Sequence, residues 1–392
     1  MRRACLAMVA VALVAGLAGG CGDGSKKAQA VTSLGLTPIA EFGDNQPTGV
    51  ALSKDSRIFV CFPKWSENHD LSVVEVLSTG VKRPYPNDQW NRWQPGADGA
   101  DRFVCVQSVY IDQYEGGTLW ILDAASPKME GVVKGGPKLV KVDLSADRVV
   151  DVFRFDESIA PTKSYLNDVR IDMNRGYAYI TDSGLGAIVV LNLKSRQARR
   201  VLEGHPSTQA QRDLVVVVNG QELRHASGEP PQIHADGIAL TKDGEYLYYQ
   251  VLTGKKLSMI PTAVLRDANS TPQQISDAVQ PQGQTVVCDG MLCDAQGDLY
   301  LTAIEQNAIV RRKPDCSMMT VIQDSRLLWP DSLAVSCDGH LYVTASQIHL
   351  MPKFNMGVSR RTTPYMMFRV DNYAVPMDGD GGQPTTTTQE AR

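Results

Sequence analysis

Six segments of the chain open with a polar residue that precedes an apolar strand pattern, and these six side chains could do chemistry together. These leading residues are Thr48, Gln107, Asn167, Asp236, Asp289 and Asp331. Carboxylate and amide oxygens suit a divalent metal such as calcium, and carboxylates also attract an organic ammonium group. Three carboxylates held close together repel one another unless a positive charge lies among them. A polar ring can also simply hold water in a protein channel.

The segments that carry these residues share one pattern, in which a turn with Gly, Asn or Asp joins two apolar strands. It is clearest at residues 236–248, where DGIAL precedes KDG and YLY. The leading residues lie 42 to 69 residues apart, and further strand patterns follow in most units. Six such units predict an all-β, six-bladed β-propeller with about four antiparallel strands per blade. Helical periodicity is short, near residues 261–266, which argues against a parallel α/β fold.

The predicted fold gives the leading residues a common position. The first strand of each propeller blade lines the central axis, so the residue that opens it lies at the mouth of the channel. We expect the six residues to form a ring that binds a ligand, with His234 at its rim. Asn167, Asp236 and Asp289 are the candidate metal ligands within this ring. A rim histidine that only hydrogen-bonds a loop is the competing interpretation of His234.

The first 20 residues have the organisation of a secretory signal peptide. Arg2 and Arg3 precede an apolar run, residues 6–17, which ends in small residues before Cys21. The run is shorter than the roughly 20 residues of a membrane span. The order predicts export to the cell envelope, with lipid attached to Cys21 and the lipid anchored in the membrane. An ordinary cleaved signal peptide is the alternative.

The rest of the chain divides into a polar tether at residues 21–33, a propeller at residues 34–370 and a tail at residues 371–392. The tail is rich in Asp, Gly and Thr and has little apolar surface to bury, so we expect it to be disordered. Loss of Arg2 and Arg3 with the signal leaves 37 basic and 43 acidic residues, a net charge of about −6. No basic patch is evident, so nucleic acid is not an expected partner.

Six cysteines remain when the signal cysteine and Cys21 are set aside. An even number in an exported protein favours disulfides. In a propeller, Cys61 and Cys105 should share one face of the disc and Cys316 and Cys337 the opposite face. We therefore expect these two disulfide pairs, with buried free thiols as the alternative.

Short motifs along the body resemble the major royal jelly protein/yellow family. They are RIFV (57–60), PKW (63–65), PYPNDQWN (84–91), LWILD (119–123), PKLV (137–140), AYITDS (178–183), DGIAL (236–240), PTAVLR (261–266), QNAI (306–309) and LWPDSL (328–333). The resemblance implies a secreted six-bladed propeller whose channel handles small ligands. Relatives in that family include dopachrome-converting enzymes and binders of biogenic amines. The resemblance does not identify a catalytic residue in this chain.

A more distant resemblance is to the gluconolactonase/regucalcin propellers, which hold a divalent metal in the channel with a Glu, an Asn and an Asp. Asn167 and Asp236 fall at suitable positions of the repeat. Thr48 stands where the first-blade Glu would be, and Asp289 or Asp331 could substitute for it. The resemblance implies a metal-dependent lactonase as an alternative function.

The sequence leaves three functions open. The first is binding of a small cationic or aromatic ligand in the channel. The second is a metal-dependent lactonase-like hydrolase or a dopachrome-type isomerase, with Asp236, Asp289 and His234 as candidate acid–base groups. The third is an envelope scaffold for protein interactions, for which the segment around Trp90 and Trp93 is a candidate. Nucleophile-elbow, phosphate-loop and zinc-protease motifs are absent from the sequence.

Overall fold

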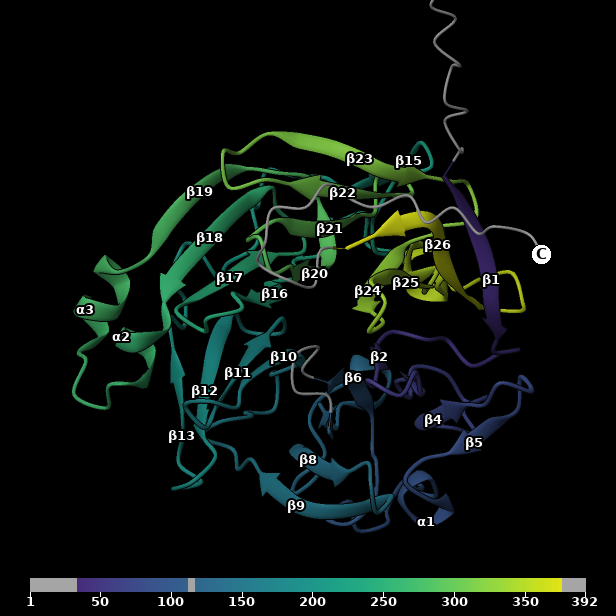
Figure 1. Cartoon of the computed structure of the whole chain (residues 1–392), viewed down its shortest axis with the longest axis horizontal. Coiled ribbons are helices and arrows are strands. Elements are labelled where there is room, and N and C mark those ends of the chain that lie inside the picture. The colour runs from purple at the N-terminus through teal and green to yellow at the C-terminus, as the bar shows by residue number, and fades with distance from the viewer. Residues whose placement is uncertain (1–33, 112–116, 376–392) are drawn as a thin grey trace, which may run out of the picture. The chain divides into compact units, whose positions relative to one another are not determined.

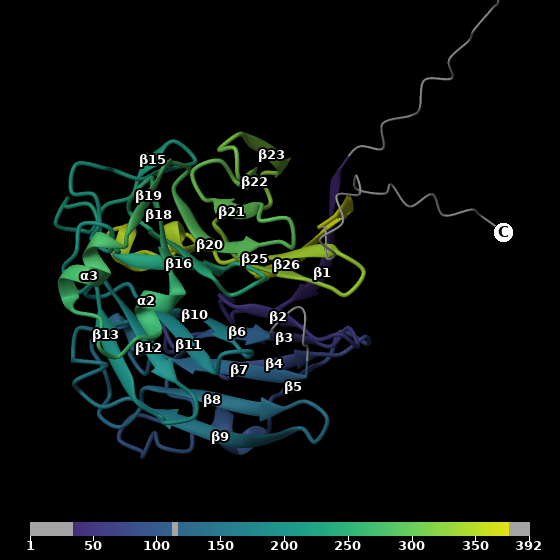
Figure 2. The same ribbon diagram turned by 60° about the vertical axis from the view of Figure 1, so that its left-hand side comes forward.

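Six four-stranded antiparallel sheets are arranged around a common axis in the computed structural model, which describes residues 34–111 and 117–375 (Figure 1). The predicted six-bladed β-propeller is confirmed. Within the second blade the strands run outward from β6 near the centre to β9 at the rim, in both views (Figures 1 and 2). The segment predicted as a signal peptide, Cys21, the predicted tether and residues 376–392 lie outside the described residues.

Five blades each use four consecutive strands. The first has β2 (Val50–Leu52), β3 (Ile58–Cys61), β4 (Val73–Val76) and β5 (Lys82–Pro84). The second has β6 (Val106–Ile111), β7 (Thr118–Asp123), β8 (Lys138–Asp143) and β9 (Arg148–Arg154). The third has β10 (Leu166–Asp172), β11 (Tyr177–Asp182), β12 (Ala187–Asn192) and β13 (Ala198–Val201). The fourth has β16 (Ala235–Leu240), β17 (Tyr246–Val251), β18 (Lys256–Pro261) and β19 (Gln280–Gln284), and the fifth has β20 (Cys288–Cys293), β21 (Leu299–Ala303), β22 (Ala308–Arg312) and β23 (Met318–Gln323).

The sixth blade joins the two ends of the propeller. It contains β24 (Pro330–Val335), β25 (His340–Ala345) and β26 (Met366–Ala374), and its outermost strand is β1 (Gly35–Glu41). Leu36 pairs with Val370, and the Thr37 hydroxyl donates to the Asp371 carboxylate at 2.8 and 2.9 Å. Because β26 continues to Ala374, the propeller extends past the boundary expected at residue 370.

Apolar side chains fill the space between neighbouring blades. Trp120 and Leu122 of the second blade pack with Val169 and Ile180 of the third, and all four are fully or almost fully buried. The other blade interfaces have similar clusters. Dense packing of this kind holds the inner strands rigidly, so it fixes the side chains that line the axis.

Helices are few and short. They are α1 (Asp88–Asn91), α2 (Thr262–Arg266) and α3 (Pro272–Asp277), with 3₁₀ turns η1 (Pro127–Met129), η2 (Ile348–Leu350) and η3 (Pro352–Phe354). A small hairpin, β14 (Val217–Val218) and β15 (Gln221–Glu222), lies between the third and fourth blades in sequence. No helix of the described part is long and apolar enough to cross a membrane.

The tryptophans proposed for a protein-interaction surface are buried. Trp90, in α1, packs against Phe103 with ring centroids 5.0 Å apart, and Trp93 packs with Val104 and Ala125. Burial of these rings stabilises the second blade and leaves no aromatic face there for a partner, so this segment does not support the scaffold alternative.

All six cysteines of the described residues are free thiols, so the two expected disulfides are not formed in this structure. The Cys61 thiol instead donates to the carbonyl of Gln107, 3.3 Å away, which ties the first blade to the second. Burial raises the pKa of Cys61 to about 12. Cys316 and Cys337 are exposed, and Cys316 accepts a contact from Arg312 at 3.0 Å.

Candidate functional site

A bulge near the start of the inner strands presents the leading residues to the axis. Pairing of β16 with β17 passes from Ala235 directly to Ile238, and pairing of β20 with β21 passes from Cys288 to Met291. The inner strands β10 and β24 skip two residues in the same way, and β6 skips one. Bulged residues are released from the ladder and their side chains are redirected. Each skipped set contains a leading residue.

Two glycines bring three of the leading aspartates close together. A Cβ atom on Gly237 would lie 2.4 Å from the carbonyl oxygen of Asp289, and one on Gly290 would lie 2.3 Å from that of Asp331. Both distances are far below van der Waals contact. The backbones of β16, β20 and β24 therefore approach as closely as they do only because these positions lack a side chain.

Five of the six leading residues surround a small acidic recess of about 10 Å³ on the axis. They are Gln107, Asn167, Asp236, Asp289 and Asp331, and Asp168 joins them. The sixth, Thr48, is fully buried outside the recess, and its hydroxyl donates to the carbonyl of Gln107 at 2.7 Å. Thr48 therefore joins two blades rather than facing the recess.

Burial sets the protonation of the carboxylates in the recess. It raises the pKa of Asp236 and of Asp331 well above the usual range, and the nearby charge of Asp289 adds to both shifts. Burial also raises the pKa of Asp289, to about 6, although the Trp329 indole N–H opposes the shift by donating to Oδ2 at 2.6 Å. Asp289 is therefore the member of the three that ionises most readily as the pH rises.

Hydrogen bonds hold the other members of the recess. Asn167 donates from Nδ2 to Oδ2 of Asp236 at 2.8 Å and to the Ser183 hydroxyl at 2.9 Å. The Ser346 hydroxyl donates to Oδ2 of Asp331 at 2.9 Å. The Ser332 hydroxyl donates to Oδ1 of Asp331 at 3.2 Å, and the carboxyls of Asp236 and Asp289 hydrogen-bond to each other.

An aromatic cavity of about 410 Å³ adjoins the recess and shares Gln107, Asn167, Asp236 and Asp289 with it. Trp65, Tyr165 and Trp329 form its aromatic walls. A chain of hydrogen bonds fixes two of these rings, because the Trp65 indole donates to the Tyr165 hydroxyl and that hydroxyl donates to Gln107, each at 2.8 Å. The cavity is therefore apolar on its sides and acidic at the end that meets the recess.

Two of the aromatic wall residues could have been found from the sequence. Tyr165 and Trp329 each stand two residues before a leading residue, Asn167 and Asp331. Alternate residues of an extended strand share a face, so this offset directs both side chains to the channel mouth. His234 has the same offset from Asp236. Trp65 comes from the loop after β3, which no repeat position predicts.

His234 is not among the residues that line the aromatic cavity. Its Nδ1 accepts from the backbone N–H of Ala210 at 3.0 Å, and burial lowers its pKa. The histidine thus fixes the loop that follows the third blade, as the competing interpretation of the sequence had it.

At the other end of the channel, Arg170 crosses from the third blade to the fifth. Its guanidinium donates to the Asp168 carboxylate at 3.0 Å and to the carbonyl of Met291 at 2.7 Å, and lies 5.2 Å from the Tyr110 ring centroid. Arg170 and Asp168 line a second cavity of about 240 Å³. The leading-residue pattern missed Asp168, which stands where other repeats carry Gly or Ser, for example Gly237.

The recess lacks the geometry of a metal site. Within residues 34–111 and 117–375, no three acidic, histidine or cysteine side chains converge as a metal site requires. Asn167 directs its amide nitrogen, which is not a metal ligand, toward Asp236, and the Trp329 indole already occupies one oxygen of Asp289. Held in this way, Asn167, Asp236 and Asp289 do not fit a divalent ion.

Comparisons with known proteins agree with the fold. Residues 104–376 match the family model described as Major royal jelly protein. No curated protein matches the sequence. Among solved structures, a luciferin-regenerating enzyme is 10% identical with a TM-score of 0.53, covering 88% of this chain and 98% of its own.

Two other similar structures are enzymes with different substrates. The PQQ-bound aldose sugar dehydrogenase of Streptomyces coelicolor is 10% identical with a TM-score of 0.51, covering 86% of this chain and 98% of its own. The gluconolactonase of Xanthomonas campestris is 11% identical with a TM-score of 0.50, covering 88% and 90%. At such low identities the likeness shows the propeller fold alone.

Proposed function

This chain belongs to the major royal jelly protein family, and we propose that its aromatic cavity binds a small ligand with a cationic group on an aromatic body. The proposal rests on one observation: a single cavity of about 410 Å³ has three aromatic side chains on its walls and buried carboxyl groups at one end. We further propose that the protein is exported and held at the cell envelope by lipid on Cys21.

The walls and the acidic end favour different parts of one ligand. An aromatic body stacks on or packs edge-on against Trp65, Tyr165 and Trp329. An ammonium group is attracted to aromatic faces and to the ionised carboxylate of Asp289. Its positive charge would balance the buried charge of Asp289, which forms no salt bridge in the described part of the chain.

Tyramine and tryptamine are suitable probes, with binding measured by calorimetry and by Trp fluorescence at pH 7.5. We expect saturable binding that Asp289→Asn weakens about tenfold, because the variant keeps the side-chain shape and removes the charge. Asp70→Asn is the matched control, since Asp70 is exposed and is not among the residues that line the cavity. Absence of saturable binding for both amines, or equal losses in the two variants, would contradict the proposal.

Isomerase chemistry is a second candidate, favoured by the unequal protonation of neighbouring carboxylates. A protonated Asp236 and an ionised Asp289 in one site are the acid and the base that a dopachrome-type tautomerisation needs. Dopachrome decay followed by absorbance tests it. Turnover that both Asp236→Asn and Asp289→Asn abolish would favour the enzyme over the simple binder.

Lactonase chemistry depends on a metal ion, so metal content separates it from the other two functions. The binder and the isomerase predict no stoichiometric metal after exhaustive dialysis. Near-stoichiometric calcium that is lost on Asp236→Ala would instead favour a metal-dependent lactonase and would show that the recess rearranges around the ion.

A further inference from the structure

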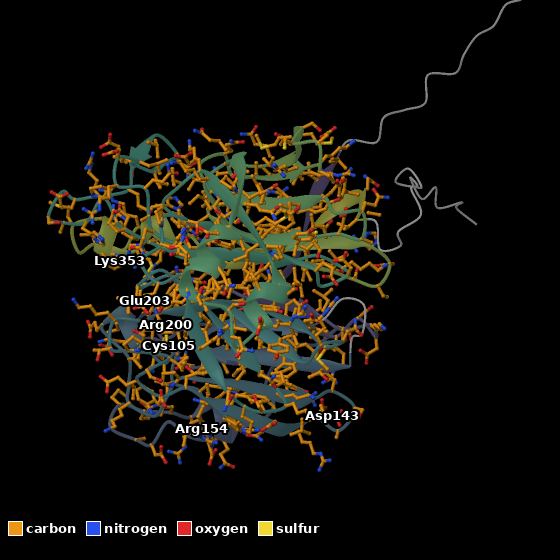
Figure 3. The ribbon with its side chains drawn as sticks, turned by 90° about the vertical axis from the view of Figure 1, so that its left-hand side faces the viewer. Cys105, Asp143, Arg154, Arg200, Glu203 and Lys353 are labelled. Carbon is orange, nitrogen blue, oxygen red and sulfur yellow. The ribbon has the colours of Figure 1, made fainter. Side chains whose placement is uncertain are left out.

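A half-buried lysine in the wall of the aromatic cavity has no part in the function proposed above. Lys353 lies in η3 and lines the cavity. Its ammonium donates to Sδ of Met129 at 2.7 Å and lies 4.8 Å from the centroid of the Phe354 ring. Figure 3 places Lys353 on the same face of the propeller as Cys105 and Arg200, and away from Asp143.

Lys353 lacks the carboxylate partner that two other cations of the described chain have. Lys138 is fully buried and pairs with Asp123 at 2.8 Å, and Arg200 pairs with Asp182 at 2.8 Å. In the described part of the chain, no carboxylate lies within ion-pairing distance of the Lys353 ammonium. A thioether sulfur and a ring face are weak partners for an ammonium group.

Partial removal of an ammonium group from water costs free energy when no counter-ion is near. The cost disfavours the charged form and so lowers the pKa of the group. Burial lowers the pKa of Lys353 to about 8. The group is therefore still mainly charged at neutral pH. An anion that enters the cavity gains a charge-assisted hydrogen bond here without having to displace a protein carboxylate.

We propose that Lys353 binds an anionic group of the ligand, so that the cavity selects aromatic zwitterions over simple aromatic amines. This inference rests on the proposed function, which assigns the ammonium group to the acidic end at Asp289. The two charges of the ligand would meet opposite charges of the cavity, with the aromatic body between the walls. The ligand class is then aromatic amino acids and related aminocarboxylates.

Two matched ligand pairs test the selection. Tyrosine and tyramine differ by a carboxylate beside the amine, and 4-(aminomethyl)benzoate and benzylamine differ by a carboxylate across the ring. We expect the zwitterion of at least one pair to bind the wild-type full chain about tenfold more tightly than its amine at pH 7. Lys353→Met should remove that preference and leave the affinity for the amines within about twofold.

Two control variants make the test specific. Lys163→Met removes an exposed lysine that lines the same cavity and should keep the preference. Lys353→Arg keeps a positive charge and should retain part of the preference for the zwitterion. Thermal unfolding of each variant shows whether it is folded, and the amine affinities show whether the cavity is intact.

The outcomes separate this inference from the function on which it rests. If none of the four probes binds, both the proposed function and the zwitterion selection fail. If the amines bind but neither carboxylate improves binding, only the selection by Lys353 fails. It also fails if the preference persists in Lys353→Met or disappears in Lys163→Met alone.

Discussion

The indole N–H of Trp329 donates to Oδ2 of Asp289 at 2.6 Å, so an aromatic wall of the cavity also controls the charge at its acidic end. Trp329 is fully buried, and the His349 ring stacks on it with ring centroids 5.9 Å apart. The hydrogen bond stabilises the ionised carboxylate and so holds the pKa of Asp289 down against burial.

Removing this donor should move the pH dependence of binding. In Trp329→Phe the pKa of Asp289 should rise above its value of about 6 by roughly one unit, because the ionised form loses a hydrogen bond. Tyramine affinity, measured from pH 5 to 8.5, should then reach half its maximum at a higher pH. Trp93→Phe is the control, because the Trp93 indole donates to the carbonyl of Ala97 outside the cavity. If the midpoint of the pH dependence is unchanged in Trp329→Phe, ionisation of Asp289 does not control binding.

The buried charge of Asp289 should lower stability at neutral pH. Its folded pKa of about 6 lies above the ordinary 3.8, so the penalty is absent below pH 4 and complete above pH 6. Asp289→Asn should therefore be more stable than the wild type by about 2–3 kcal/mol at pH 8, and similar to it at pH 4. Urea unfolding at the two pH values measures the difference. A variant that is equally stable or less stable at pH 8 would show that the carboxylate is not destabilised by burial.

The ion pair of Lys138 and Asp123 should be essential to the second blade. Both side chains are fully buried, and the Lys138 ammonium also donates to the carbonyls of Gly99 and Gly136 at 2.9 and 2.8 Å. Lys138→Met leaves a buried carboxylate unpaired and should cost about 3–5 kcal/mol in denaturant unfolding.

Two comparisons locate the cause of that loss. The double variant Lys138→Met/Asp123→Asn should recover part of the stability, because it removes the unpaired charge. Arg92→Met, which breaks an exposed pair with Asp88, should cost less than about 0.5 kcal/mol. A loss in Lys138→Met no larger than that in Arg92→Met would contradict the role of the buried pair.

A side chain at position 290 should destabilise the protein, because β20 and β24 lie too close together at Gly290 to accommodate one. Gly290→Ala would place a Cβ atom 2.3 Å from the Asp331 carbonyl, so the strands must separate. We expect a loss of about 1–3 kcal/mol in unfolding free energy and weaker amine binding. At Gly117 an added Cβ meets nothing within 4 Å, so Gly117→Ala is the matched control and should change neither quantity.

Membrane attachment through Cys21 can be tested by fractionation. Cys21→Ala should leave the protein unmodified and release it from the membrane fraction, whereas Cys316→Ala, a change at an exposed cysteine of the propeller, should not. The mass of the N-terminal peptide shows whether lipid is attached. A mature N-terminus without lipid in the wild type would favour an ordinary cleaved signal peptide.

The sequence revealed the fold because the repeat records the pattern of strands and turns in every blade. It also located most of the acidic recess, since the leading residues of the second to sixth repeats occupy equivalent bulges on the axis. Thr48 was misplaced because the first inner strand has no bulge, and the buried Thr48 hydroxyl instead bonds to the Gln107 carbonyl of the next blade. Polar type alone could not distinguish a residue that faces the recess from one that joins two blades.

Other parts of the site could not be found from the repeat. Lys353 lies in an irregular segment between β25 and β26, where no periodicity fixes the direction of a side chain. Arg170 lies in the channel and bonds to the carbonyl of Met291 in the fifth blade. Such a contact between distant strands depends on how the blades pack, and the spacing of residues in the sequence does not predict it.

The pairing of β1 with β26 has a consequence for how the protein is made. The last blade needs both the first strand and the last strand of the propeller, so the ring stays open until the whole body has been synthesised. The export proposed above would benefit from that delay, because a chain passes a narrow secretion pore more easily before the ring has closed. The same strand pair would also bear any force applied through the proposed N-terminal tether, because β1 is the first strand of the propeller.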